Sequence, residues 1–115
     1  MQDSFKMSNN TEQDLVLSQI IQRLVDGFKP SKIYLFGSRA KGTARGNSDY
    51  DLLVVLPEKK EHTHTLSIRA GDLLADLHIS NDILFTSLEK FERRKKVIGA
   101  LAEIAYSEGK ELYAA

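Results

Sequence analysis

Apolar residues recur along the chain with two different periods, and these periods separate helices from strands. Between residues 11 and 28 they return every three or four positions, which is the spacing of one face of a helix. Residues 33–36 are four apolar residues in a row, as expected for a strand that is covered on both faces. The pattern predicts a first helix that ends at Gly27 and Pro30, followed by a buried strand.

Further elements follow from the same periods. Residues 38–45 allow about two helical turns, and residues 50–56 form a second apolar strand. The connection between the two strands, residues 39–49, is too short for a crossover helix with its loops, so these strands are expected to be antiparallel. Residues 65–79 have helical spacing, and residues 82–85 predict a third strand.

After the third strand the sequence predicts two more helices. Thr86 and Glu89 have the spacing of a capping box, which would open a helix through residues 91–97. A last helix is expected to stop at Gly109, before a short extended end. The order of elements predicts an α/β fold of the α+β type, a small mixed sheet flanked by helices.

The length of the chain allows one hydrophobic core. At 115 residues and 12.9 kDa, residues 11–115 are expected to form a single domain that holds both scaffold and site. Residues 1–10 are polar and show no periodicity, so they are expected to form a flexible tail.

Composition narrows the classes of partner. The 16 Lys and Arg residues are balanced by 16 Asp and Glu residues, whereas a domain that holds a long phosphate backbone needs an excess of cations. There is no apolar run near the ~20 residues that cross a bilayer, no signal-peptide pattern and no cysteine. Neither nucleic acid nor a membrane is therefore an expected partner, and the expected location is the cytoplasm.

Acidic residues begin two of the predicted strands. Asp49 and Asp51 are two positions apart, so in an extended strand both project from one face while Tyr50 points away. Neighbouring carboxylates repel each other unless a cation lies between them, and Mg²⁺ binds carboxylates together with phosphate oxygens. Asp82 is the candidate third ligand if its strand lies beside the second one. The alternative for Asp82 is a turn aspartate after Asn81.

The turn between the first strand and the short helix could bind phosphate. Gly37 would let the backbone approach a ligand, and free N–H groups at the helix start could bind phosphate oxygens together with the Ser38 hydroxyl. Arg39 and Lys41 add positive charge nearby. Taken alone, Ser38 could equally be an ordinary N-cap, and GNSDYD an ordinary turn.

The two features share one spacing: a Gly-Ser pair, ten residues, then Asp-x-Asp at the head of an apolar strand. The stretch FGSRAKGTARGNSDYDLLVV resembles the G-S-x10-D-x-D signature of the DNA polymerase beta nucleotidyltransferase superfamily. It is most similar to the stand-alone minimal nucleotidyltransferases, the MNT proteins. NDILFTSLEKFE resembles the strand that carries that family's third acid, and AEIAYSEGKELY its closing helix. The resemblance covers nearly the whole chain and implies the nucleotidyltransferase fold.

The resemblance implies a role for each candidate residue. Gly37 and Ser38 would hold a triphosphate, Asp49 and Asp51 would bind the metals, and Asp82 would complete the triad and assist deprotonation of an acceptor hydroxyl. The implied cofactors are Mg²⁺, as two ions, and ATP as the nucleotide donor. The implied partner is a HEPN-domain toxin, because MNT antitoxins of HEPN/MNT pairs can transfer AMP to a toxin tyrosine.

Two other functions stay open on the sequence. The protein could neutralise a HEPN partner by binding alone, as a non-catalytic interaction module. It could also transfer a nucleotide to a small molecule such as an aminoglycoside, with an oligomer supplying the second wall of the substrate site. The basic residues 93–96 are interpreted as a helix end that offsets the helix dipole, with binding of phosphate or of an acidic partner surface as the alternative.

Overall fold

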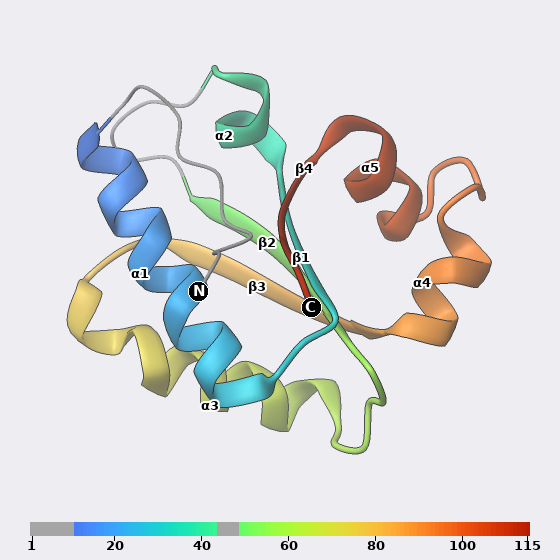
Figure 1. Ribbon diagram of the computed structural model, residues 1–115, viewed down its shortest axis with the longest axis horizontal. Coiled ribbons are helices and arrows are strands. Elements are labelled where there is room, and N and C mark those ends of the chain that lie inside the picture. The colour runs from blue at the N-terminus through green and yellow to red at the C-terminus, as the bar shows by residue number, and fades with distance from the viewer. Residues whose placement is uncertain (1–10, 44–48) are drawn as a thin grey trace.

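The computed structural model describes residues 11–43 and 49–115; the expected N-terminal tail, residues 1–10, lies outside this range. Figure 1 shows the arrangement of helices and strands. In chain order the elements are α1 (Thr11–Phe28), β1 (Lys32–Phe36), α2 (Gly37–Lys41), β2 (Tyr50–Leu56), α3 (Thr63–Leu74), the 3₁₀ turn η1 (Ala75–Leu77), β3 (Asn81–Ser87), α4 (Leu88–Arg94), α5 (Leu101–Glu108) and β4 (Lys110–Ala114).

The strands form one mixed sheet in the order β3-β2-β1-β4. β1 pairs antiparallel with β2 and with β4, whereas β2 and β3 are parallel. The mixed sheet and the antiparallel pairing of the first two strands are thus confirmed. Because β2 and β3 run in the same direction, their first residues lie side by side at the same end of the sheet.

Helices cover both faces of the sheet (Figure 1). In β2, Leu52 and Val54 pack in a core with residues of α1 and α3, whereas Leu53 and Val55 pack in a second core with α4 and α5. This alternation gives a strand that is buried on both faces, as its continuous apolar run predicts. No helix in residues 11–43 and 49–115 is long and apolar enough to cross a membrane.

The core beneath α4 and α5 is built around one phenylalanine. Phe91 is fully buried, stacks on Tyr34 at 5.1 Å between ring centroids and meets the edge of Tyr106 at 6.3 Å. Burial of such a side chain stabilises the fold by about 1.5–3 kcal/mol, and aromatic pairs add about 0.5–1.5 kcal/mol each. Phe91 therefore fixes α4 over the sheet face that α5 also covers.

The end of α1 differs from the prediction. The helix continues through Gly27, and Lys29 takes the left-handed conformation with φ of 50°, its N–H bonded to the Val25 carbonyl at 2.9 Å. Gly27 serves the packing of two helices instead, because a Cβ there would lie 2.6 Å from Leu73 Cδ1 of α3. The predicted glycine cap was wrong: Lys29 takes the left-handed conformation after the helix, while Gly27 lies inside the helix and lets Leu73 pack closely against it.

Near the C-terminus one prediction is wrong by a residue and another is confirmed. The cap of α4 is Ser87, whose Oγ accepts from the Lys90 N–H at 3.1 Å, while Thr86 belongs to β3. The predicted N-cap was therefore one residue early, and the cap is a single serine hydrogen bond rather than a capping box, because the residue three positions after Ser87 is lysine. The extended end after Gly109 is a fourth strand, β4, which pairs with β1 at the edge of the sheet.

Candidate active site

The three candidate acids begin the two parallel strands. Asp51 is paired in register with Asp82, and Asp49 directly precedes β2. Asp51 alternates with Tyr50, which is buried in the core beneath α1 and α3, so the Asp51 side chain projects toward the α4–α5 face. Asp82, in β3, alternates in the same way with Ile83 of the α1–α3 core. The parallel pairing thus places Asp51 and Asp82 next to each other on one face.

The turn after β1 lies directly against one of these acids. Gly37 follows Phe36, the residue paired with Asp51 across β1 and β2. Its φ is 74°, and a Cβ on Gly37 would overlap Asp51 Oδ2 and lie 3.2 Å from Asp51 Cγ. Glycine is therefore favoured here for two reasons: an L side chain disfavours this backbone conformation, and its Cβ would enter the space of the carboxylate.

Charge repulsion connects the three acids. Asp51 is half-buried, and Asp49 and Asp82 are exposed. The pKa of the Asp51 carboxyl is raised, first by burial and then by the negative charges of Asp82 and Asp49. Like charges at one site favour protonation of one member, and a bound cation removes that penalty. The electrostatics therefore fit a site for a positive ion.

Ser80 orients Asp49, a role that sequence analysis missed. Its carbonyl accepts from the Tyr50 N–H at 2.9 Å, and its hydroxyl donates a hydrogen bond to Asp49 Oδ1. Ser80 precedes β3 and is 31 positions from Asp49. No local pattern indicates this contact, because only the parallel pairing of β2 and β3 brings the two residues together.

The remaining candidates lie on α2. Ser38 is half-buried in its first turn. The guanidinium of Arg39 lies 3.9 Å from the centroid of the Tyr50 ring, and Lys41 Nζ lies 3.5 Å from Glu108 Oε1. These two cations thus contact Tyr50 and Glu108, which are not among the three aspartates. The exposed pair of Lys41 with Glu108 is worth only about 0–1 kcal/mol.

The donor set agrees with a hard metal ion, although its side chains are not gathered into a finished site. Within residues 11–43 and 49–115, no group of three or more His, Cys, Asp or Glu residues could hold a metal ion as placed. Asp49 is turned toward Ser80. Carboxylate oxygens are the ligands that Mg²⁺ prefers, and it completes its shell with water and substrate phosphate oxygens. The three carboxylates therefore suit Mg²⁺ chemically.

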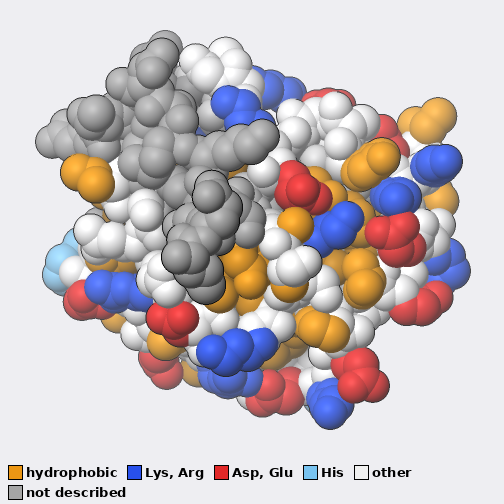
Figure 2. All heavy atoms as spheres, viewed as in Figure 1, with side chains coloured by type: hydrophobic (Ala, Val, Ile, Leu, Met, Phe, Trp, Pro, Cys, Tyr) orange, Lys and Arg blue, Asp and Glu red, His pale blue; other side chains and the backbone are white. Residues whose placement is uncertain are grey.

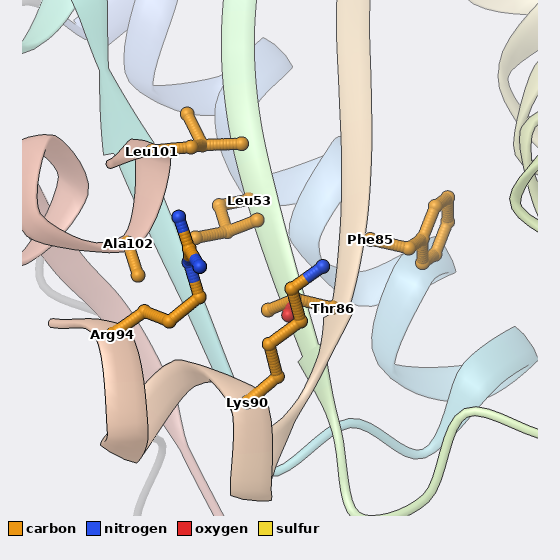
Figure 3. A pocket seen from close by; sticks show the side chains of 7 residues that line it. All are labelled: Leu53, Phe85, Thr86, Lys90, Arg94, Leu101 and Ala102. Carbon is orange, nitrogen blue, oxygen red and sulfur yellow. The ribbon is translucent and has the colours of Figure 1, made fainter. Parts of the chain in front are cut away.

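A pocket continues along the same sheet face between β2, β3, α4 and α5 (Figure 3). Its volume is about 340 Å³, and it is lined by Leu53, Phe85, Thr86, Lys90, Arg94, Leu101 and Ala102. Leu53 is two positions after Asp51 in β2, and Thr86 is four positions after Asp82 in β3. The pocket and the acids thus share one face of the same two parallel strands.

This combination of sheet, strand-Gly-Ser-helix turn and paired acids defines a nucleotidyltransferase fold. The chain belongs to the nucleotidyltransferase domain family, whose pattern matches residues 17–109. No curated protein matches the chain.

Solved structures of antitoxins share the fold. A toxin–antitoxin crystallised with AMP-PNP is 26% identical, with 85% of this chain and 73% of that chain covered and a TM-score of 0.61. An MntA–HpeT toxin–antitoxin mutant in which two aspartates are replaced by glutamate is 25% identical, with the same coverage and a TM-score of 0.62. A third similar structure is the MNT antitoxin in complex with a tri-AMPylated Shewanella oneidensis HEPN toxin, which is 24% identical. The match covers 90% of this chain and 73% of that chain with a TM-score of 0.55, and it shows the fold alone. The resemblance to MNT antitoxins is thus confirmed.

Proposed function

We propose that this protein is a Mg²⁺-dependent nucleotidyltransferase that transfers AMP from ATP to a tyrosine hydroxyl of a HEPN toxin, and so acts as its antitoxin. The observation that carries the proposal is the close approach of Gly37 to Asp51, which is paired with Asp82. This puts a phosphate-binding turn beside carboxylates that repel one another. Membership of the nucleotidyltransferase family supports the reaction class. The similar toxin–antitoxin crystallised with AMP-PNP, an ATP analogue, supports the donor and the partner.

Each residue at the site has a defined part in this reaction. Asp49, Asp51 and Asp82 would hold the metal ions, which lower the pKa of an attacking hydroxyl and steady a leaving pyrophosphate. The turn at Gly37 and Ser38 offers an N–H group and a hydroxyl to the phosphates. On α2, Arg39 and Lys41 add charge, and the exposed pair of Lys41 with Glu108 is weak enough for phosphate to replace it.

The proposed AMP transfer exchanges one bond to the α-phosphorus for another. The tyrosine oxygen bonds to the α-phosphorus, the bond from that phosphorus to the bridging oxygen of the β-phosphate breaks, and pyrophosphate leaves. Asp82, which is exposed, is the carboxylate that accepts the tyrosine proton. Asp51 is suited to ion binding alone, because it is half-buried against Gly37, whereas Asp82 would both contact a metal ion and accept the proton.

Transfer of labelled AMP from ATP to a purified cognate HEPN protein, with and without Mg²⁺, tests the proposal. We expect labelling that requires Mg²⁺ and is lost in D51N and D82N. Asp72→Asn, an exposed change on α3, is the matched control and is expected to label normally. Full neutralisation of the toxin by D51N without any label would favour the non-catalytic antitoxin. Label on an aminoglycoside but never on the toxin would favour the small-molecule enzyme.

A further inference from the structure

The basic residues of α4 and of the turn directly after it differ in their contacts. Arg93 pairs with Glu89 at 2.9 Å, and Lys95 pairs with Glu92 at 2.7 Å and lies 4.8 Å from the centroid of the Tyr106 ring. These cations are therefore satisfied within their own helix and its neighbour. Arg93 and Arg94 lie in the last turn of α4, as the interpretation of a basic helix end predicts.

Lys90 and Arg94 form a second group. Their side chains line the pocket and extend from α4 toward β2 and α5 (Figure 3). In the described part of the chain, no acidic side chain forms an ion pair with either of them. Two cations at the mouth of one pocket repel each other, so an anionic group bound between them would be stabilised.

An apolar surface adjoins this pocket. The connection from α4 to α5 and the first residue of α5 expose Val97, Ile98 and Leu101, with Ile98 94% exposed. Figure 2 shows hydrophobic side chains at the edge of the molecule where Figure 1 places this connection. Leu101 also lines the pocket. Single exposed apolar residues are ordinary, whereas apolar residues grouped on one surface are a feature that protein-binding sites share.

We propose that Lys90, Arg94, Val97, Ile98 and Leu101 form the docking surface for the acceptor protein, called here the α4–α5 surface. The partner presents an apolar side chain to Val97, Ile98 and Leu101 and a carboxylate to Lys90 and Arg94. This inference rests on the proposed function, because it names where the acceptor of that reaction binds.

Charge and position favour a protein rather than the nucleotide at this surface. A neutral nucleobase would leave both cations without an anion, and the phosphates are assigned to the turn at Gly37, on the other side of β2 from β3. Thr86 at the pocket is four residues from Asp82 in an extended strand, which is roughly 13 Å. A short segment of a docked partner can span that distance and bring its tyrosine to the aspartates.

Binding of the purified cognate HEPN protein and of AMP-PNP, measured separately by calorimetry, tests the surface. We expect K90E/R94E to weaken HEPN binding at least tenfold while AMP-PNP affinity stays within twofold of wild type. R93E/K96E is the matched control, since it changes the net charge equally in the last turn of α4 and the turn directly after it, and it should bind HEPN nearly as wild type does. Ile98→Asp should also weaken HEPN binding, whereas Ile68→Asp, which alters an exposed isoleucine on α3, should not.

Other results would overturn the surface. HEPN affinity unchanged in K90E/R94E would do so, as would equal losses in K90E/R94E and R93E/K96E, or a loss confined to AMP-PNP. Should K90E/R94E unfold, K90Q/R94Q provides the same comparison without new negative charges. The proposed function fails separately: wild type that binds HEPN at this surface but transfers no label would overturn the reaction and leave the docking surface standing.

Discussion

The carboxylate of Asp51 occupies the space that a side chain on Gly37 would fill. Gly37 begins α2 directly after β1, Asp51 lies in β2, and the antiparallel pairing of Phe36 with Asp51 brings them together. The backbone that would bind phosphate and the carboxylate that would bind metal are therefore in direct contact. A side chain at position 37 would therefore displace the Asp51 carboxylate.

Replacing Gly37 by alanine should damage both the fold and the site. A positive φ costs an L residue about 1–2 kcal/mol, and the overlap with Asp51 adds to that cost. We expect a lower melting temperature and loss of AMP-PNP binding by calorimetry. Gly71→Ala, in α3 with nothing within 4 Å of the added Cβ, is the control and should stabilise the helix by up to about 1 kcal/mol. Equal behaviour of the two variants would contradict the proposed contact.

The raised pKa of Asp51 predicts how stability depends on pH. Its pKa is higher in the folded than in the unfolded chain, so its ionisation lowers stability as pH rises from the unfolded value through the folded one. Without divalent ions, D51N should therefore be more stable than wild type at pH 7, and this gain should vanish at about pH 3, where both states are protonated. Urea unfolding of both proteins in EDTA, at pH 7 and at about pH 3, measures the difference in their free energies of unfolding. A D51N variant less stable than wild type at pH 7 would contradict the repulsion among these acids.

Bound Mg²⁺ should offset the loss of stability that ionisation of Asp51 causes. An ion that binds only the folded protein raises its stability by about 2.7 kcal/mol at one hundred times its dissociation constant. The melting temperature of wild type should rise with added Mg²⁺, whereas that of the D49N/D51N double variant should not. Asp72→Asn, which removes one exposed carboxylate from α3, is the control for a change outside the site and should respond as wild type does. A rise of equal size in the double variant would place the ion elsewhere.

Removing the Ser80 hydroxyl should act on metal binding more than on stability. Loss of one hydrogen bond costs about 1 kcal/mol, but groups that orient metal ligands change metal affinity by about ten- to one hundred-fold. We expect S80A to need roughly tenfold more Mg²⁺ for transfer, measured as activity against Mg²⁺ concentration. Ser107→Ala removes a comparable hydroxyl from α5, where it donates to the Glu103 carbonyl at 2.8 Å, and should leave the Mg²⁺ requirement unchanged. An unchanged requirement in S80A would remove Ser80 from the site.

Local signals predicted much of the fold. The predicted second strand, residues 50–56, has the bounds of β2, because it is a continuous apolar run between polar turns. The short connection before it was enough to predict the antiparallel pairing with β1. Helix ends were less accurate, since Lys29 rather than glycine takes the left-handed turn after α1 and Ser87 rather than Thr86 caps α4. Several neighbouring residues could end or cap each helix, and tertiary packing decides which of them does.

The sequence by itself determined which residues carry the candidate chemistry: a Gly-Ser pair and Asp-x-Asp at a fixed spacing within one segment. The tertiary structure alone decided which residues join them. The parallel register of β2 and β3 pairs Asp51 with Asp82 and brings Ser80 to Asp49, and α4 extends Lys90 and Arg94 over the same face. Periodicity records how each segment folds locally, whereas register between distant strands is set by the packing of both sheet faces at once.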